Sequence, residues 1–384
     1  MPAILLAVTG TDPQPWSDRL RALAPQRDIR LWPDHDPADI AYACAWHAPR
    51  ALFARLPHLK VIFSLGAGVD HIFADPDLPD VPVVRIVDPD LTMRMTEYVV
   101  LHVLAYHRRQ RLYDVQQRER VWHEHAQPPA SAVAVGVMGL GVLGAAAAGA
   151  LASLGFRVAG WSRTAKTPAG IECFHGEAGL EAFLRRSEIF VCLLPATPAT
   201  HGILDLKLLR KLKRDGAAGG AYLINAARGA LQVEADILSA LDEGSLAGAT
   251  LDVFAREPLP VTSPLWRHPK VTITPHNAAF SDPQALAAGV LRQIERFEAG
   301  LPLEHVIDRT RGYQSDGRAG ADPLPAVARA PGDRPRSRRA ARRICPTQND
   351  SALLKDLRLA HRHTPFCETA PARPLAPRWP RRAD

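Results

Sequence analysis

The sequence predicts an α/β protein with parallel sheets, and two observations carry this prediction. Short apolar segments of strand length alternate with segments of helical periodicity over residues 1–313, as a series of parallel βα units requires. One strand-like segment, residues 133–138, ends in a G-x-G-x-x-G turn, and an Ala-rich segment of residues 145–154 follows it. A strand, a glycine turn and a helix in this order are typical of a doubly wound sheet. We therefore expect two Rossmann-like lobes, each with a doubly wound parallel sheet, and a disordered C-terminal tail.

The composition describes a globular chain that is long enough for two domains. Of its 384 residues, 47% are hydrophobic and 23% are charged, and about 100–200 residues per domain is usual. No apolar run reaches the roughly 20 residues of a membrane span. The apolar segment 1–8 has no basic region before it, so it reads as a first strand and not as a signal peptide. The five cysteines are scattered, odd in number and form no C-x-x-C pair, which argues against a disulfide framework and a zinc site and suits a reducing cytoplasm.

The excess positive charge lies in the C-terminal tail. The formal net charge is +7, but residues 314–384 hold 15 Arg or Lys and 7 Asp or Glu, and residues 1–313 hold 32 and 33. Pro and Arg dominate the tail and its apolar periodicity is lost, so we expect it to be disordered. An Arg-rich tail could contact nucleic acid or anionic lipid. We favour a solvated appendage, because no aromatic residue is interleaved with the arginine cluster at 334–343 for base stacking.

The first hundred residues have the pattern of a first α/β lobe. A helix is expected at 16–23, and strands are expected at 3–8, 28–32, 40–45 and 61–64. Residues 97–122 are expected to form one long helix, because their apolar side chains share a face. The pair Pro128-Pro129 then reads as the linker into the glycine-rich unit.

The glycine turn opens a second series of βα units. Helices are expected at 180–186, 206–212 and 233–241, and strands at 156–161, 188–194, 221–225, 249–254 and 271–274. The amphipathic segment 283–299 is expected to cross back to the first lobe. The chain should thus comprise a substrate lobe of residues 1–100, completed by 281–313, and a dinucleotide-binding lobe of residues 101–280. We expect the site in the cleft between them.

The glycine turn itself is suited to a dinucleotide pyrophosphate. Its first glycine allows a tight turn, its second lets backbone N–H groups approach the phosphates, and its third lets helix and strand pack closely. The helix N-terminus adds unpaired N–H groups and positive dipole. Glycine turns also serve plain packing, but the strand and helix on either side favour a cofactor. The expected binding residues are Gly139, Leu140, Gly141, Val142, Leu143 and Gly144.

The end of the next strand predicts which dinucleotide binds. Folds specific for NAD place an acidic residue about 20 positions after the glycine turn, and no carboxylate stands there in this chain. Ser162, Arg163 and Thr164 follow the strand instead, with Lys166 nearby, and a guanidinium binds a ribose 2′-phosphate bidentately. A solvent-facing arginine at a strand end is the alternative. We expect NADPH (NADP) as the preferred cofactor, with NAD(H) as the second choice.

Three polar residues stand at the ends of later strands, where ligands bind an open α/β sheet: Arg228, Glu257 and His276. Hydride reduction of a 2-keto acid needs a cation for the carboxylate and carbonyl, an acid for the developing alkoxide and a carboxylate beside that acid. Arg228, His276 and Glu257 supply these groups, and a Glu beside a His favours the imidazolium. Singly, each has a structural alternative as a surface arginine, a loop carboxylate or a packed histidine. Their placement in one dinucleotide fold favours catalysis.

With these motifs in view, the chain resembles the D-isomer-specific 2-hydroxyacid dehydrogenases, and most closely their glyoxylate/hydroxypyruvate reductase A branch. The resemblance runs from about residue 1 to residue 313, and segment 308–313 is similar to the natural C-terminus of that branch. The ordered motifs that carry it are far more specific than the glycine turn alone. They are LGAGVD at 65–70, MTEY at 95–98, the glycine turn, WSRT at 161–164, NAARG at 225–229, LDVF at 251–254, REPLP at 256–260 and PH at 275–276.

The resemblance implies a role for each site residue. Arg228 would bind and polarise the substrate, His276 would donate the proton, and Glu257 would pair with His276. Asp252 would meet the nicotinamide carboxamide, although an Asp at a strand end is often only a cap. The substrate carboxylate would be held by the backbone of a nest-like turn, and two further side chains would shape the pocket. These residues are Ala67, Gly68 and Val69 in the turn, and Trp46 and Arg85, for which a strand-ending turn, a buried Trp and a surface Arg are the alternatives.

The implied activity is NADPH-dependent reduction of glyoxylate to glycolate and of hydroxypyruvate to D-glycerate, in a cytoplasmic homodimer formed through the cofactor lobe. Two positions depart from the family pattern: Arg94 stands where Gln is usual, and Asn277 where a small or apolar residue is commoner. Neither removes a catalytic group, but both leave the substrate preference open. The alternatives are a dehydrogenase for a bulkier or phosphorylated keto acid and a non-catalytic, NAD(P)-sensing corepressor-like scaffold.

Overall fold

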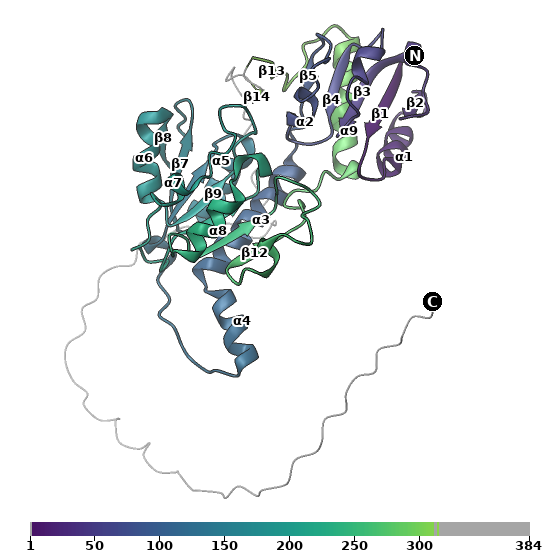
Figure 1. Cartoon of the computed structure of the whole chain (residues 1–384). Helices are drawn as coiled ribbons and strands as arrows, with labels where there is room; N and C mark the ends of the chain where they lie inside the picture. The colour runs from purple at the N-terminus through teal and green to yellow at the C-terminus, as the bar shows by residue number, and fades with distance from the viewer. Residues whose placement is uncertain (1, 311–312, 315–384) are drawn as a thin grey trace, which may run out of the picture. The chain divides into compact units, whose positions relative to one another are not determined.

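The computed structural model describes residues 2–310 and 313–314, and its first parallel sheet has the strand order β2-β1-β3-β4-β5 (Figure 1). All of its pairings are parallel. Both β1 and β3 consist almost wholly of buried residues, as expected of strands covered on two faces. The strands are β1 (Ala3–Val8), β2 (Ile29–Leu31), β3 (Ile40–Trp46), β4 (Val61–Ser64) and β5 (Val83–Val84).

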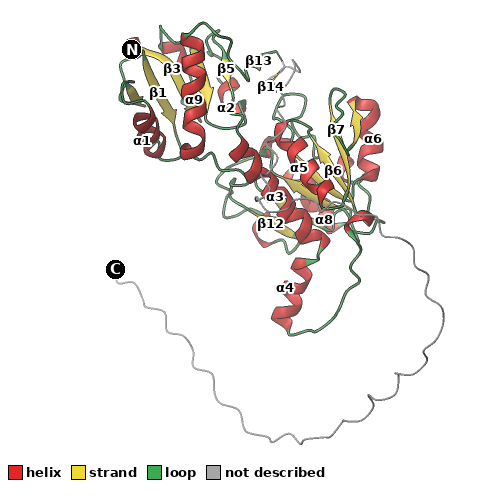
Figure 2. Cartoon of the chain, turned by 180° about the vertical axis from the view of Figure 1, so that it is seen from behind, coloured by secondary structure: helices red, strands yellow, loops and turns green. Residues whose placement is uncertain are grey.

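Alternate residues of β1 face two different hydrophobic cores. Ile4 and Leu6 pack with α1 (Gln14–Leu23) and α9 (Pro283–Glu298), two helices that contact each other. Leu5 instead joins a core that contains residues of α2 (Asp70–Phe73) and of the short 3₁₀ helix at Phe53–Arg55. Although α9 follows the second sheet in sequence, its buried face therefore belongs to the first sheet, beside which it runs in Figure 2.

The second sheet has the order β12-β11-β10-β9-β6-β7-β8, again with parallel pairings throughout. The chain starts this sheet at β6, adds β7 and β8 on one side and then returns to add β9 to β12 on the other. This reversal is the hallmark of a doubly wound sheet, so the predicted fold class is confirmed. The strands are β6 (Ala134–Met138), β7 (Arg157–Ser162), β8 (Glu172–His175), β9 (Ile189–Cys192), β10 (Tyr222–Asn225), β11 (Gly248–Leu251) and β12 (Val271–Ile273).

The helix α3 (Pro89–His107) leads the chain from the first sheet to the second. It packs against α5 (Val142–Ser153), and its buried residues, Val99 and Val103 among them, share a core with β6. The other helices beside this sheet are α6 (Gly176–Arg186), α7 (Leu206–Leu209) and α8 (Glu234–Asp242). We propose that the chain divides into a substrate lobe of residues 1–100 and 281–313 and a dinucleotide-binding lobe of residues 101–280, with the C-terminal part of α3 packed in the second.

The expectation of one long helix at 97–122 was wrong. The structure has α3 and a separate helix, α4 (Gln110–Glu119), which extends away from the sheet in Figures 1 and 2. The break falls at Arg109, whose φ of 56° is left-handed and so interrupts the helical hydrogen bonds. The start of α3 is earlier than expected because Asp88 caps it, accepting from the N–H of Asp90, and Pro89 occupies the first turn.

Within the two parallel sheets, the strands β5 and β8 were not expected from the sequence. β5 contains only two residues, and β8 is an edge strand with no buried residue, so neither has the apolar run by which the other strands were found. Within residues 2–310 and 313–314, no helix is long and apolar enough to cross a bilayer. The predictions for the tail fall outside the described residues, except that Gln314 belongs to β14 (Tyr313–Gln314), which pairs with β13 (Ile307–Asp308).

Candidate active site

The glycine turn lies at the end of β6, at the point where the order of the second sheet reverses. Gly139 has a φ of +112°, and a Cβ on it would lie 2.7 Å from the carbonyl oxygen of Leu193. A Cβ on Gly144 would lie 1.8 Å from the carbonyl oxygen of Gly139. Both positions therefore require glycine, the first for the turn and the second for close packing of the turn on α5.

The N-terminus of α5 has room for a phosphate. Gly141 is the N-cap, and among the described residues nothing beyond its chain neighbours lies within 4 Å of where its Cβ would stand. Leu140 is buried and Leu143 packs partly into the core, whereas Val142 is exposed. Unpaired N–H groups at the start of a long helix with open space before them suit an anion. The residues present thus fit a dinucleotide pyrophosphate.

The end of β7 lies directly beside this turn, because the N–H of Gly139 donates to the carbonyl oxygen of Trp161 over 2.8 Å. The Ser162 hydroxyl donates to the carbonyl oxygen of Thr164 over 2.7 Å, which shapes the chain after the strand. Arg163 is exposed in this bend. The structure therefore brings Ser162, Arg163 and Thr164 to the side of the turn where the ribose of a dinucleotide lies.

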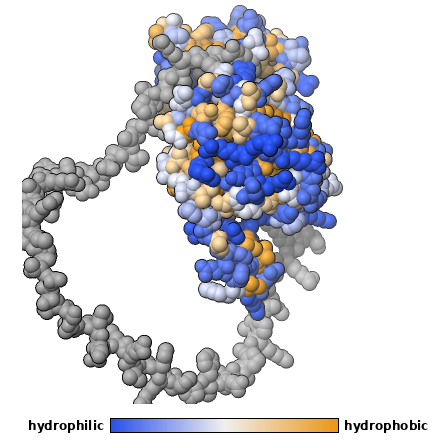
Figure 3. Space-filling model, turned by 90° about the vertical axis from the view of Figure 1, so that its left-hand side faces the viewer, coloured by the Kyte–Doolittle hydropathy of each residue, from blue (hydrophilic) through white to orange (hydrophobic). Residues whose placement is uncertain are grey.

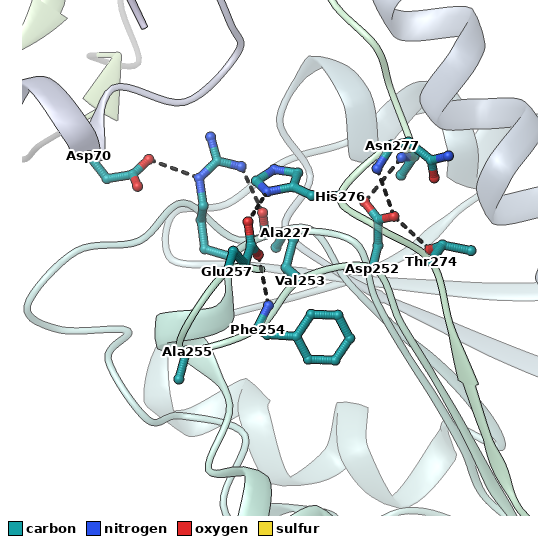
Figure 4. A network of polar contacts seen from close by, with 12 residues as sticks. Asp70, Ala227, Asp252, Val253, Phe254, Ala255, Glu257, Thr274, His276 and Asn277 are labelled. Carbon is teal, nitrogen blue, oxygen red and sulfur yellow. Dashed lines mark hydrogen bonds and ion pairs between the residues drawn. The ribbon is translucent and has the colours of Figure 1, made fainter. Parts of the chain in front are cut away.

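Glu257 and His276 form a hydrogen-bonded pair beyond the ends of β11 and β12 (Figure 4). His276 Nδ1 lies 2.6 Å from Glu257 Oε2, and Glu257 Oε1 accepts from the N–H of Phe254 over 2.8 Å. Burial alone would raise the pKa of Glu257, but these two hydrogen bonds and the charges of His276 and Arg228 lower it overall. Glu257 is therefore an anionic partner for Nδ1, and Nε2 is the ring nitrogen that can serve a substrate.

Asp252 anchors the backbone on both sides of His276. Its Oδ1 accepts from the Thr274 hydroxyl (2.6 Å) and the Asn277 N–H (3.0 Å), its Oδ2 accepts from the Ala278 N–H (3.0 Å), and its carbonyl oxygen accepts from the His276 N–H (2.8 Å). Its side chain is buried, with 1% exposure. His276 has a left-handed φ of 52°, a conformation that such surroundings must enforce. In this structure the Asp252 carboxylate is directed at the His276 segment, a contact that the sequence did not suggest.

Arg228, in the loop after β10, contacts both lobes. Its Nε donates to Asp70 Oδ1 over 2.9 Å, and its Nη1 donates to the carbonyl oxygen of Ala227 over 2.7 Å. Asn225 fixes the start of the loop by accepting from the Ala227 N–H and donating to Gln232. Asp70, Glu257 and His276 point toward the same space in Figure 4. The structure thus gathers the three predicted catalytic residues in one region.

The turn that contains Ala67, Gly68 and Val69 connects β4 to α2 and is part of the same region. Trp46, at the end of β3, covers this turn, since a Cβ on Gly66 would lie 2.7 Å from the indole Cζ3. The Trp46 and His276 ring centroids are 6.4 Å apart, so the two lobes meet here.

Arg85, the other predicted pocket residue, is partly buried just after β5. Burial lowers the pKa of its guanidinium. Its backbone N–H donates to the carbonyl oxygen of His305 over 3.3 Å. A role for Arg85 in the pocket stays a prediction.

The sequence reasoning missed three residues of this region: His47, Asp70 and His71. The His47 and His71 rings lie 4.8 and 5.2 Å from the Trp46 ring. Burial lowers the pKa of both, that of His71 to about 4, so both imidazoles are neutral at physiological pH. Asp70 ends the LGAGVD motif and could have been suspected from that position. Among the described residues, no group of three His, Cys, Asp or Glu side chains could hold a metal ion.

The family model for the D-isomer specific 2-hydroxyacid dehydrogenase NAD-binding domain matches residues 100–278. Glyoxylate/hydroxypyruvate reductase A of Escherichia fergusonii is 43% identical over 306 residues, which are 78% of this chain and 96% of that protein. This chain belongs to the D-isomer specific 2-hydroxyacid dehydrogenase family. The resemblance stated from the motifs is therefore confirmed, and the protein is a dehydrogenase.

Solved structures of related dehydrogenases share its fold. The NADPH-dependent glyoxylate/hydroxypyruvate reductase of Sinorhizobium meliloti, in complex with NADP and sulfate, is 46% identical with a TM-score of 0.78, covering 82% of this chain and 100% of that one. A D-isomer specific 2-hydroxyacid dehydrogenase of Xanthobacter autotrophicus, in complex with NADPH and MES, is 43% identical with a TM-score of 0.77, covering 81% and 99%. For this dehydrogenase the roles of individual site residues stay predictions.

Proposed function

We propose that this dehydrogenase reduces small 2-keto acids, with glyoxylate and hydroxypyruvate as its first substrates and NADPH as the hydride donor. The observation that carries the proposal is the hydrogen-bonded Glu257–His276 pair at the carboxyl ends of the second sheet, with Arg228 near enough for its charge to help lower the pKa of Glu257. A cation, a proton donor and an oriented carboxylate are the groups that reduction of a 2-keto acid requires. The products are glycolate and D-glycerate.

The residues of the chain divide this work between them. Arg228 binds the substrate carboxylate and polarises the carbonyl, since a guanidinium stabilises negative charge as it develops on oxygen. His276 delivers a proton from Nε2 to that oxygen, while Glu257 holds Nδ1 and so fixes the plane of the ring. The N–H groups of Ala67, Gly68 and Val69 complete the carboxylate site.

NADPH, when bound, supplies the hydride to the carbonyl carbon. The glycine turn and the start of α5 hold its pyrophosphate. Arg163 binds the ribose 2′-phosphate with help from Ser162 and Thr164, and no carboxylate stands at this strand end to favour a free 2′-hydroxyl. Asp252 serves this arrangement by keeping His276 in place, and its Oδ2, which accepts from the Ala278 N–H, has a second lone pair for the nicotinamide carboxamide.

Trp46 favours a small substrate over a bulky one. Its ring fills the space above Gly66 and lies near His276, so a side chain on the keto acid would meet the indole. Glyoxylate has no side chain and hydroxypyruvate has only a hydroxymethyl group. We therefore expect a higher kcat/KM for glyoxylate and hydroxypyruvate than for keto acids with aromatic or branched side chains.

Oxidation of NADPH and of NADH by the full chain, measured with glyoxylate, hydroxypyruvate, pyruvate and phenylpyruvate, tests this proposal. We expect the highest kcat/KM for the first two substrates with NADPH. A preference for phenylpyruvate would point to the dehydrogenase for bulkier substrates. Cofactor binding without turnover of any substrate would instead point to a non-catalytic scaffold.

We also propose that the enzyme acts in the cytoplasm as a homodimer formed through its second lobe. Exposed apolar side chains on α4 and the segment after it support this: Leu112, Val115, Val121 and Trp122, the last of which is fully exposed. Figure 3 shows apolar surface on this projecting segment, and contiguous apolar surface marks protein interfaces. Light scattering of the full chain tests it: Trp122→Ser with Val115→Ser should shift the mass from dimer to monomer.

A further inference from the structure

Arg228 is held by a carboxylate of the opposite lobe. Its Nε donates to Oδ1 of Asp70 over 2.9 Å, and Asp70 is the first residue of α2, directly after the turn at 67–69. Its Nη1 is held within its own lobe by the carbonyl oxygen of Ala227. Two bonds to different nitrogens of a planar guanidinium fix both its position and the orientation of its plane.

The guanidinium also lies against the backbone of Gly68. A Cβ at this residue would be 1.7 Å from Nη2 and 2.6 Å from Cζ of Arg228, and 2.8 Å from Oδ1 of Asp70. Gly68 therefore leaves the space that the guanidinium and the carboxylate occupy together. With Nε and Nη1 engaged, Nη2 stands beside the turn that is expected to receive the substrate carboxylate.

Asp70 stands on a turn that is itself internally bonded. The Ser64 hydroxyl donates to the carbonyl oxygen of Gly68 over 2.7 Å and accepts from the N–H of Gly66 over 3.3 Å. Ser64 is fully buried. A guanidinium bonded to Asp70 is thus held in a fixed position relative to the substrate lobe.

We propose that Asp70 is a positioning residue, which acts through Arg228 by aligning its guanidinium with the substrate turn before the keto acid arrives. The inference rests on the proposed function, because it concerns the residue that binds the substrate there. It assigns to the LGAGVD motif a second task, since the motif then supplies both the turn for the substrate carboxylate and the anion that orients the opposing cation.

A carboxylate at this position repels the negatively charged substrate, and this effect can be separated from positioning by kinetics. Burial alone would raise the pKa of Asp70, but Arg228 lowers it overall, so Asp70 is an anion that repels an incoming keto acid. Removing Asp70 should therefore not weaken binding of the keto acid. The guanidinium of Arg228, however, would no longer be held in its aligned position. Misalignment by about 1 Å costs on the order of 10²-fold in rate. Loss of Asp70 should accordingly lower kcat without raising KM.

Steady-state kinetics of Asp70→Ala and Asp70→Asn with glyoxylate and NADPH provide the test. We expect kcat of Asp70→Ala to fall about 10- to 100-fold with KM for glyoxylate unchanged or lower. Asp70→Asn should recover part of this loss, because its amide oxygen can still accept from Nε. A kcat for Asp70→Ala equal to that of the wild type would overturn the inference, as would a loss that lies wholly in KM.

A double-mutant cycle separates positioning from general support of the fold. In the Arg228→Lys background the Nε donor is gone, so Asp70→Ala should add less than about threefold to the loss, whereas a structural role would give the full loss again. Asp75→Asn is the matched control, since Asp75 lies in the same segment but accepts from the N–H groups of Ala51 and Asp77, and it should keep wild-type kcat. Additive losses would overturn the inference. Absence of turnover in the wild type would instead refute the proposed function.

Discussion

The proton donor and the substrate cation of the proposed active site are held in different ways. The hydrogen bonds described for His276 come from its own lobe, through Glu257 on its ring and Asp252 on its backbone, and Trp46 of the first lobe adds a ring contact. Arg228 belongs to the same lobe, but its Nε is bound by Asp70 of the other. The hydrogen bonds of the proton donor therefore form without the first lobe, whereas one of the two bonds that orient the cation exists only where the two lobes meet.

The two supporting carboxylates differ accordingly. Asp252 is buried, with 1% exposure, and accepts three hydrogen bonds through its side chain. The Asp70 side chain is 34% exposed and holds Arg228 by a single nitrogen. Loss of a buried carboxylate leaves several donors unsatisfied, so Asp252 should matter to the stability of the segment that carries His276. Loss of Asp70 should matter mainly to turnover.

The largest effect on kcat is expected from a substitution at His276. His276→Ala removes the proposed proton donor, and loss of a general acid costs about 10²–10⁴-fold in kcat. Binding of NADPH, followed by its fluorescence, should stay near the wild-type value because the glycine turn is unchanged. His268→Ala is the matched control, since His268 contacts the exposed Asp242. This variant should keep the wild-type kcat. A kcat within about threefold of the wild type for His276→Ala would exclude it as the donor.

Glu257→Gln should have the next largest effect on kcat and should alter the dependence of the unfolding free energy on pH. The pKa of Glu257 is lowered in the folded protein from the ordinary value of 4.5. Such a carboxylate stabilises the fold above its unfolded pKa, and this contribution is lost as pH falls through its folded pKa. The variant should lose roughly 10- to 100-fold in kcat, and its unfolding free energy should fall less steeply below about pH 4.5.

The matched control for this change is Glu234→Gln. Glu234 accepts from the N–H of Ala255, in the same loop, whereas the hydrogen bond to His276 comes from Glu257. If both variants lose turnover equally, the loop matters and not the carboxylate beside His276. The comparison between the two halves of the site would then weaken, because His276 would not depend on its own lobe's carboxylate.

The sequence predicts the parts of this site whose signals lie within a few consecutive residues, and it misses contacts between residues far apart in the chain. The glycine turn, the longer strands and the motifs of Arg228, Glu257 and His276 are local signals, and the sequence predicts them, whereas the short strand β5 and the exposed edge strand β8 were missed. Contacts such as Arg228 to Asp70 join residues 158 positions apart, and no local pattern encodes them. The break at Arg109 was missed for a different reason, because the apolar face continues across it while one left-handed residue separates α3 from α4.

Arg163→Ala should change cofactor choice more than turnover. Loss of a charge-assisted bond to a phosphate costs about 1.5–3 kcal/mol, so KM for NADPH should rise roughly 10- to 100-fold while KM for NADH changes little. Arg157→Ala, at the opposite end of β7, is the matched control. An equal rise for both cofactors would contradict a role of Arg163 in binding the 2′-phosphate. It would leave the comparison between His276 and Arg228 untouched, since these residues follow β12 and β10 and not β7.

The smallest effect is expected at Arg94, which links α3 to the start of α9 through Asp90 (2.7 Å) and Asp282 (3.4 Å). Like the Arg228–Asp70 pair it joins segments on the path between the lobes, but its side chains are about one-third exposed, and such pairs contribute about 0.2–1 kcal/mol. Arg94→Gln should therefore lower Tm by a few degrees at most and change kcat/KM for glyoxylate less than about threefold. Arg185→Gln removes a comparable surface pair with Glu181 on α6 and controls for the charge. A much larger loss of turnover for Arg94→Gln alone would mean that alignment of Arg228 depends on the interlobe segments as well as on Asp70.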